Sequence, residues 1–505
     1  MNKTTLTLGA LSACALAVLT ACGGSGSSDN ATSFSGTAAV GAAITGATVS
    51  AKCVSGTPES AVTTGSDGGY SLKVTDATLP CIIKISGGKV GAVDNMQALH
   101  TLATAAGTAH ITPFTEMVVA RAFGTDANTA FAGLTSTTAS SAKAALGDAQ
   151  NYVKTVLADA GVTAPTVDLV TGTLKVGDTN YDAALETLKT KLTASGTTVA
   201  ELAKAAANQG ANPTNNGKQT VSLQFAMVAG NTPIGCNQAI EGLGTANTTA
   251  QLKDARFYIS QVNLVRLDGS AVPLTLGAND DWNHTAGDDR VSLIDLENAT
   301  GSCPTTTGTV ATNDTITGTA PAGLYTGVQF VMGVPFALNH TSTTASTTPV
   351  MLQNASLAWS WQSGRKFAKV EVTDPGTSTA WPTNTFNFHL GSTACTGNPA
   401  NGETTTCANP NRMTVPLSGF DYKTQKIAFD VKALLAGEDV TKNDGGTANL
   451  AGTAWTNSST GCMSGSTAGD CITVFDALQL NLAAGSGGTS IDGGKKQRVF
   501  KAIAK

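Results

Sequence analysis

Apolar and polar residues alternate along many short stretches of the C-terminal half of the chain. The stretches 221–228, 257–265 and 325–331 each alternate with a period of two, and Gly, Asn and Asp residues separate them. Such alternation between turn residues predicts antiparallel strands with one face buried and the other in solvent. We therefore predict an antiparallel β-sandwich domain over residues 219–505.

A smaller β-rich stretch occupies residues 34–94, where the β-prone runs 48–53 and 69–74 are separated by turn residues. The second run is entered through Asp67-Gly68-Gly69-Tyr70. Turns of this Asp-Gly-x-Tyr kind recur in the carboxypeptidase regulatory-like, transthyretin-type β-sandwich, which this stretch resembles. The resemblance implies a small β-sandwich with a structural or supporting role.

Between these two regions, residues 95–210 are rich in alanine and carry apolar residues at helical spacing, such as Leu185, Leu188 and Leu192. This spacing predicts a small helical domain. We interpret His100 and His110 as ordinary polar or half-buried residues, because ten residues do not place two side chains on one helix face. Residues 211–218, with Asn, Pro and Gly, are predicted to be a linker. The predicted fold class is mostly β, with this helical domain in the middle.

The N-terminus has the pattern of an exported lipoprotein. Lys3 precedes an apolar run over residues 6–19, and the sequence Leu19-Thr20-Ala21-Cys22 follows it. The run is too short to span a bilayer and ends in a lipobox, so we predict a signal peptide over residues 1–21 and lipidation at Cys22. Residues 22–33, rich in Gly and Ser, are predicted to be a flexible tether.

The signal peptide and lipobox predict a cell-envelope protein that is bound to a membrane through its lipid anchor. The residue after Cys22 is glycine rather than an acidic residue, which favours the outer membrane over retention at the inner one. The body of the protein is expected to face the periplasm or lie at the outer membrane.

Charge and cysteine content narrow the possible functions. The formal net charge is −5, and Lys and Arg residues form no cluster, which excludes a nucleic-acid-binding protein. Ten cysteines become eight once Cys14 leaves with the signal peptide and Cys22 is acylated. An even number in an oxidising compartment predicts disulfides. Proximity in sequence suggests three pairs, Cys53 with Cys81, Cys395 with Cys407 and Cys462 with Cys471, which leaves Cys236 for Cys303.

The motifs of common enzyme classes are missing from the sequence. There is no Walker loop, no His-Glu-x-x-His and no Gly-x-Ser-x-Gly. No Cys-x-x-Cys-His is present either, so the chain carries no c-type haem of its own. We predict a protein that is not an enzyme.

Two of the five histidines occupy distinctive contexts, His340 in Leu-Asn-His and His389 in Phe-Asn-Phe-His. Neutral imidazole is a natural ligand for copper, which heads the affinity order of the divalent metals. Strand alternation would place His389 on the opposite face from Phe388, as expected for a ligand that projects away from a core. His340 and His389 are therefore candidate copper ligands.

The C-terminal half resembles the MbnP family, in the branch of metallo-mystery-pair four-cysteine proteins with a Trp-x-Trp motif. The ordered matches include the stretches 252–259, 272–276, 293–297, 323–327, 333–336, 338–340, 359–362 and 389–392, together with the late cysteines. They extend over nearly the whole half, whereas the two N-terminal segments lie outside the resemblance.

The resemblance implies a copper-binding protein that works beside a dihaem c-type cytochrome of the peroxidase superfamily, an MbnH-like partner. That partner would oxidise a tryptophan to a kynurenine, with His340 and His389 as the copper ligands. Trp359 and Trp361 are the first candidates for modification, and strand alternation would put both rings on one face. Trp282 and His284 form a rival Trp-x-His pair. The four cysteines of the branch would be Cys395, Cys407, Cys462 and Cys471, as disulfides or, alternatively, as a thiolate copper site.

A second hypothesis belongs to a different class of function. The β-domains could present the surface of a structural or adhesion lipoprotein in which the histidines are incidental. A neighbouring gene for a dihaem peroxidase-like cytochrome would favour the copper-binding hypothesis over this one.

Overall fold

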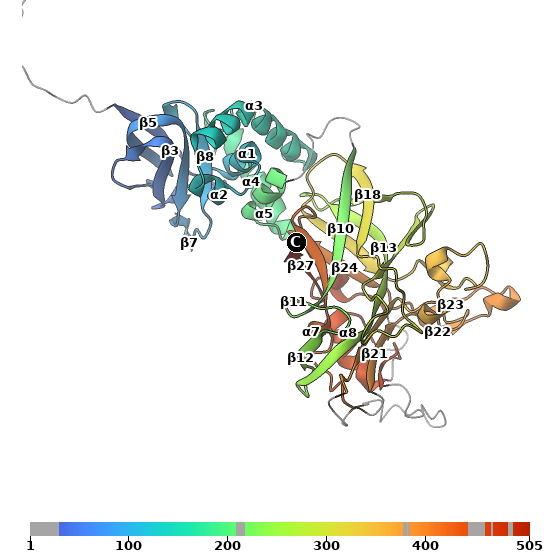
Figure 1. The fold of residues 1–505 in the computed structure, drawn as a ribbon. Helices are drawn as coiled ribbons and strands as arrows, with labels where there is room; N and C mark the ends of the chain where they lie inside the picture. The colour runs from blue at the N-terminus through green and yellow to red at the C-terminus, as the bar shows by residue number, and fades with distance from the viewer. Residues whose placement is uncertain are drawn as a thin grey trace, which may run out of the picture.

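The computed structural model describes residues 30–208, 218–376, 381, 384–442, 460–465, 468–482 and 488–505 (Figure 1). The predicted signal peptide, the lipidation site Cys22 and residues 211–217 of the predicted linker lie outside these residues. None of the described helices is long and apolar enough to cross a bilayer.

The N-terminal β-region is built around one six-stranded sheet and one three-stranded sheet. The larger sheet has the order β4-β3-β5-β1-β9, with β8 paired to β5. Its strands are β1 (Ala31–Thr37), β3 (Thr48–Pro58), β4 (Val62–Thr63), β5 (Gly69–Ser86), β8 (Leu99–Ala103) and β9 (Gly107–Thr108). The smaller sheet contains β2 (Ile44–Thr45), β6 (Lys89–Val90) and β7 (Val93–Asp94).

Both predicted boundaries of this β-region differ from the structure. Strand β1 begins at Ala31, inside the predicted tether, and β8 and β9 lie beyond the predicted end at residue 94. Every residue of β8 is buried, so this strand shows no polar–apolar alternation by which it could have been recognised.

Five helices follow: α1 (Pro113–Phe123), α2 (Ala127–Ala132), α3 (Ser136–Asp159), α4 (Tyr181–Ser195) and α5 (Val199–Asn208). A capping box between Thr112 and Thr115 starts α1, and Gly124 in the left-handed conformation ends it. Phe34 and Leu72 of the sheet share one buried cluster with Phe114 and Leu185 of the helices. The sheet and the helices, predicted as two domains, therefore form one N-terminal unit.

The C-terminal domain is mostly β, as predicted, and contains two large sheets (Figure 1). The first has the order β15-β18-β10-β25-β27, with β11 beside β10. Its strands are β10 (Lys218–Ala229), β11 (Thr232–Pro233), β15 (Thr275–Leu276), β18 (Thr315–Pro321), β25 (Gln425–Asp430) and β27 (Phe500–Ala504). Neighbours in this sheet are antiparallel except for the parallel pair β10 and β25.

The second sheet is ten-stranded, with the main order β16-β17-β13-β20-β21-β26. These strands are β13 (Thr248–Val265), β16 (Asn283–Ala286), β17 (Asp289–Asp295), β20 (Ala368–Thr373), β21 (Thr385–Leu390) and β26 (Thr460–Cys462). Off this path lie β12 (Ala239–Leu243), β14 (Ala271–Pro273), β19 (Gly327–Met332) and β24 (Met413–Ser418). A separate two-stranded sheet consists of β22 (Thr393–Thr396) and β23 (Thr406–Asn409).

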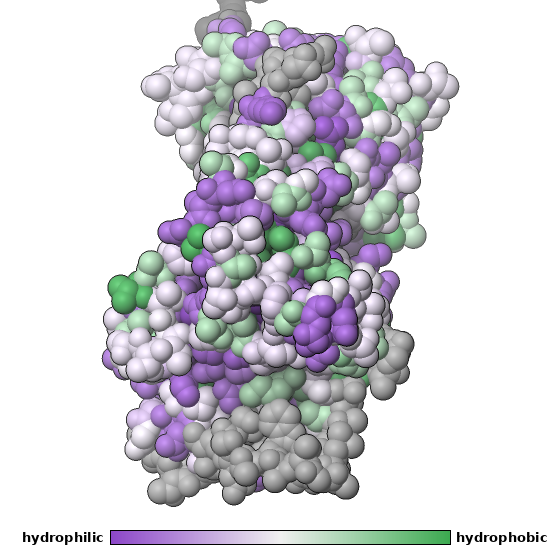
Figure 2. Space-filling model, turned by 90° about the vertical axis from the view of Figure 1, so that its right-hand side faces the viewer, coloured by the Kyte–Doolittle hydropathy of each residue, from purple (hydrophilic) through white to green (hydrophobic). Residues whose placement is uncertain are grey.

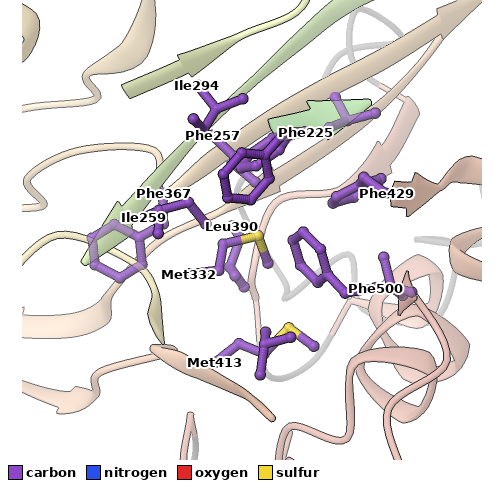
Figure 3. Packing of buried hydrophobic residues seen from close by; sticks show 14 of the residues in the cluster. Phe225, Phe257, Ile259, Ile294, Met332, Phe367, Leu390, Met413, Phe429 and Phe500 are labelled. Carbon is purple, nitrogen blue, oxygen red and sulfur yellow. The ribbon is translucent and has the colours of Figure 1, made fainter. Parts of the chain in front are cut away.

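Aromatic and aliphatic side chains together fill the space between the two large sheets (Figure 3). The rings of Phe257 and Phe429 stack at 5.5 Å, and Phe500 meets Phe330 edge-on at 5.3 Å. Both geometries lie in the favourable range for aromatic pairs. On the face of the molecule shown in Figure 2, hydrophilic and hydrophobic residues are intermingled.

The four disulfide pairs suggested by the sequence are all confirmed. Cys53–Cys81 joins β3 to β5, and Cys395–Cys407 joins β22 to β23. The remaining helices of the domain are short: α6 (Phe336–Asn339), α7 (Val431–Leu434) and α8 (Ile472–Leu478). Five 3₁₀ turns complete the elements: η1 (Val350–Leu352), η2 (Ala355–Leu357), η3 (Pro399–Asn401), η4 (Gly469–Cys471) and η5 (Ile491–Gly494).

Candidate metal centre

Strand β21 places His389 between two neighbouring strands. It pairs with β20 in antiparallel fashion, where His389 lies opposite Lys369, and with β26 in parallel fashion, where Phe388 is aligned with Cys462. Phe388 belongs to the hydrophobic core. His389 therefore points to the other face of the sheet, as strand alternation predicted.

A carboxylate fixes the orientation of the His389 ring. The ring atom Nε2 lies 2.8 Å from Oε1 of Glu371, and both side chains are almost fully buried. Burial alone would raise the pKa of Glu371, but the His389 hydrogen bond and nearby Lys369 lower it to about 2. The ionised carboxylate accepts the Nε2 proton, so Nδ1 keeps the lone pair that can bind a metal.

The imidazole of His389 is also kept neutral. Burial lowers the pKa of His389, and this effect outweighs the opposing effect of the hydrogen bond that the ring donates to Glu371. A metal can bind histidine only through an unprotonated nitrogen, so the ring is in the form that a metal requires.

Met463 lies next to His389 because of the parallel pairing between β21 and β26. Cys462 is aligned with Phe388, and the next residues along the two strands are Met463 and His389. The hydroxyl of Ser464 donates to the His389 carbonyl at 2.9 Å and accepts from the Gly391 amide at 3.0 Å. The Cys462–Cys471 disulfide further fixes this segment. The thioether of Met463 is thus held beside the imidazole.

The side chains of His389 and Met463 both open into one cavity of about 480 Å³. It is lined by Trp359, Ser363, Lys366, His389, Ser392, Thr393, Ala394, Cys395 and Met463. The cavity therefore joins an imidazole, a thioether and an indole ring in one place.

Trp359 and Trp361 lie in a turn, not in a strand as predicted. The amide of Trp359 donates to the Gly364 carbonyl at 3.1 Å, and the Gly364 amide donates to the Ser360 carbonyl at 2.7 Å. Both residues line one pocket of about 230 Å³ together with Thr341 and Arg365, but their other contacts differ. Trp359 lines the cavity of His389, whereas Trp361 is 40% exposed and donates its Nε1 proton to the His340 carbonyl.

The Trp359 ring lies directly against the backbone two residues after His389. A Cβ atom on Gly391 would come within 2.5 Å of Cζ3 of Trp359. Only glycine leaves room for this contact, so Gly391 brings the indole ring close to the His389 strand.

His340 follows α6 and faces a different group of residues. Its Nε2 lies 3.1 Å from the Asn339 side-chain amide and 3.5 Å from Sγ of Cys407. Burial lowers the pKa of His340, which keeps this ring neutral as well. The cavity of His389 includes Cys395 but not His340, so the Cys395–Cys407 disulfide stands between the two predicted ligands.

His284 and Trp282 lie near the edge of the ten-stranded sheet that is farther from His389. His284 is in β16, and β17, β13 and β20 separate that strand from β21. Four steps of about 4.8 Å each put His284 roughly 19 Å from His389 along the sheet. The two histidines therefore cannot bind the same ion.

A buried network of charged residues continues from Glu371 into the sheet. Lys369 lies 3.4 Å from Glu371 and 2.5 Å from Asp254, and Asp254 also pairs with Arg256 at 2.5 Å. At the end of this network farthest from Glu371, burial raises the pKa of Asp295 to about 7. A hydrogen bond from Thr309 and the charge of Arg256 act in the opposite direction but are outweighed. The network anchors Glu371 and, through it, the ring of His389.

Met463 was missed by the sequence reasoning. It lies 74 positions after His389 in a segment without strand-like alternation, so no local pattern connects the two residues. The adjacent Cys462 was the only available signal, because a disulfide cysteine marks a segment that is held in place.

Comparisons with known proteins give two matches and one negative result. Residues 218–464 match the model of the MbnP family. The chain is similar to the solved structure of MbnP from Methylosinus trichosporium, with 32% sequence identity and a TM-score of 0.48. That match covers 57% of this chain and 99% of the Methylosinus protein. A search of curated proteins finds no match.

Proposed function

This chain belongs to the MbnP family, and from that premise we propose that its C-terminal domain binds a copper ion through His389 and Met463, beside Trp359. Membership of the family indicates a methanobactin-related, copper-associated protein. The observation that carries the residue assignment is the shared cavity in which imidazole, thioether and indole meet.

The donors in the cavity fit copper in its reduced state. Thioether sulfur is a soft ligand that selects copper(I), and neutral imidazole suits copper in either oxidation state. Glu371 holds Nε2 of His389, an arrangement common among metal-binding histidines. Lys366 is the cationic residue of the cavity, and its charge disfavours a divalent ion more than a monovalent one.

Trp359 is the tryptophan that we propose for conversion to kynurenine. It lines the cavity, whereas Trp361 lies on the surface beside His340 and Trp282 lies near β16. Ring opening would replace an indole, which has no free lone pair, with an aniline nitrogen and a carbonyl next to the metal. The sequence has no haem-attachment motif, so the oxidant would come from a partner, the MbnH-like dihaem c-type cytochrome.

The proposed setting is the cell envelope, with the protein attached through a lipid on Cys22 and the copper domain in the periplasm or at the outer membrane. The N-terminal signal sequence and the oxidised state of all eight described cysteines support this setting. The chain would acquire or store copper without turnover of its own.

The test is copper content together with intact mass, measured on mature protein from the native host. We expect about one copper per chain and a tryptophan peptide with one oxygen gained and one carbon lost, located at Trp359. The His389→Ala and Met463→Leu variants should lose copper. The matched controls His284→Ala and Met96→Leu should keep it, because Met96 is 90% exposed and lies in the N-terminal unit.

Native protein that contains no copper and has an unmodified mass would contradict the proposal. The structural or adhesion lipoprotein would then be the remaining hypothesis. Copper that survives in the His389→Ala variant but disappears in a His340→Ala variant would move the site to the other side of the disulfide.

A further inference from the structure

Three groups that can bind a soft metal meet at the border of the His389 cavity, which one of them, Cys395, also lines. One nitrogen of His340 and the sulfur atoms of Cys395 and Cys407 all lie within 4.8 Å of one another. His340 Nε2 approaches Sγ of Cys407 at 3.5 Å, and the two cysteines are bonded to each other. The copper site proposed above uses none of these three groups as a ligand.

This disulfide is also the one most open to another molecule. Cys395 and Cys407 are both partly exposed, whereas each of the other three disulfides has at least one buried cysteine. Thiol–disulfide exchange requires a thiolate to reach a sulfur atom, so exposure decides which bond reacts first. A reducing protein can therefore approach Cys395–Cys407 from either cysteine, whereas Cys236–Cys303 offers one partly exposed cysteine and the other two disulfides offer none.

Opening this bond would leave the rest of the domain folded. Strands β22 and β23 pair only with each other, in a sheet of two strands. The Cys462–Cys471 disulfide, by contrast, ties β26, a strand of the ten-stranded sheet, to η4. The hairpin can thus change its redox state without disturbing the two large sheets.

We propose that Cys395, Cys407 and His340 form a second copper(I) site that opens when this disulfide is reduced. A dithiol, such as that of a thioredoxin-like periplasmic protein, supplies two electrons and two protons. The Cys395–Cys407 bond breaks, two thiols form, and the dithiol becomes a disulfide. Copper(I) then displaces the thiol protons and binds two thiolates and Nε2 of His340.

The ligand set selects copper(I) over zinc. Two thiolates with one imidazole are soft donors, and three ligands are enough for copper(I). Structural zinc sites are almost always tetrahedral and need a fourth protein ligand. Within the described part of the chain, the metal-binding cluster at this place has three members.

The second site would lie directly beside the first. Cys395 lines the cavity that holds His389 and Met463, and its disulfide partner Cys407 contacts His340. Reduction would thus create a docking point from which copper(I) can reach His389, and oxidation would close it. The inference adds an ion and does not depend on the His389 assignment.

The test compares copper(I) binding by the mature full-length protein before and after limited anaerobic reduction with dithiothreitol. Copper(I) is titrated against a chromophoric chelator, and mass spectrometry after alkylation identifies which thiols were released. We expect Cys395 and Cys407 to be released first, together with the uptake of about one additional copper(I) per chain. X-ray absorption should detect thiolate sulfur ligands that are absent from the oxidised protein, whose proposed site holds only the Met463 thioether.

Variants distinguish copper(I) binding at this site from an effect of reducing another disulfide. The C395S/C407S variant should lose the additional copper(I), and C53S/C81S should keep it. The second pair is a matched control, because Cys53 and Cys81 also face each other on adjacent antiparallel strands, and no histidine is clustered with them in the described residues. His340→Asn removes a proposed ligand and should weaken the additional binding more than about 100-fold, beyond the loss expected for an outer partner.

Two results would overturn the proposal. One is reduced wild-type protein, with Cys395 and Cys407 alkylated after release, that takes up no more copper(I) than the oxidised protein. The other is additional copper(I) that persists in C395S/C407S. A H389A/M463L variant keeps the two proposals distinguishable, because it should lose the copper of the oxidised protein and retain the reduction-dependent ion.

Discussion

The molecule contains two buried histidine–glutamate pairs with nearly the same geometry. In the N-terminal unit, Nδ1 of His100 lies 2.8 Å from Oε2 of Glu116. In the C-terminal domain, Nε2 of His389 lies 2.8 Å from Oε1 of Glu371. All four side chains are almost completely shielded from solvent.

The surroundings of the two pairs differ. His100 lies in the fully buried strand β8, near the ring of Phe131 at 5.9 Å, and its other nitrogen is buried without a hydrogen-bond partner in the described structure. His389 lines a cavity of about 480 Å³ that also contains a thioether. A carboxylate behind a histidine thus orients the ring in both places, but only the second place has room and a further donor for an ion.

Replacing each histidine with alanine should give the largest difference between the two pairs, in copper(I) affinity for His389 and in stability for His100. His389→Ala removes a proposed ligand and should lower copper(I) affinity more than about 100-fold, beyond the loss expected for an outer partner. His100→Ala leaves the buried Glu116 carboxylate with the backbone amide of residue 100 but without the imidazole, and should destabilise the N-terminal unit by about 1–3 kcal/mol. Chelator competition and denaturant unfolding measure the two effects. Equal loss of copper binding in both variants would refute the distinction.

Glutamine in place of each glutamate should give the next largest difference. Glu371→Gln keeps the size of the side chain but removes the carboxylate that accepts the Nε2 proton of His389. We expect copper(I) affinity to fall roughly 10- to 100-fold. Glu116→Gln should leave copper(I) affinity unchanged, and a competition titration of both variants decides between these outcomes.

Two glycines provide a comparison based on packing. Gly391→Ala would push a methyl group into the Trp359 ring and should destabilise the C-terminal domain by about 1–3 kcal/mol. Gly147 lies in α3 with no other atom within 4 Å of an added Cβ. Gly147→Ala should stabilise the N-terminal unit by up to about 1 kcal/mol. Thermal unfolding followed by tryptophan fluorescence tests the first change, and unfolding followed by circular dichroism tests the second.

The last comparison concerns the pH dependence of stability. The raised pKa of Asp295, about 7, means that the folded domain binds this proton more tightly than the unfolded chain does. Stability from this group is therefore present below the unfolded pKa and is lost as pH rises towards 7. His110 in the N-terminal unit has the opposite sign, because burial lowers its pKa and stability is lost as pH falls below its usual value.

Asp295→Asn should therefore reduce the loss of stability of the C-terminal domain between about pH 4 and 7, by on the order of 1 kcal/mol for each pKa unit of the shift. Native-state hydrogen exchange at several pH values can follow the two regions separately. An unchanged pH dependence in this variant would show that Asp295 does not titrate in that range.

Several parts of the fold and the site could be predicted from local sequence. Strand alternation identified the β-rich C-terminal domain and put His389 on the face opposite Phe388. Three disulfides followed from proximity, because their cysteines are at most 28 residues apart, and Cys236–Cys303 followed as the remaining pair. Local rules failed at Trp359 and Trp361, where a turn closed by Gly364 replaced the expected strand.

The sequence by itself determined the fold class, the disulfide pairs and the strand position of His389, because these depend on local periodicity and short-range spacing. Only the tertiary structure decided which residues accompany His389. Met463 lies beside His389 because β26 pairs with β21 in parallel, and the Trp359 ring lies close to this strand because Gly391 leaves room for it. The Cys395–Cys407 disulfide separates His340 from His389. Strand pairing and close packing join residues far apart in sequence, and no pattern along the chain records which partners they join.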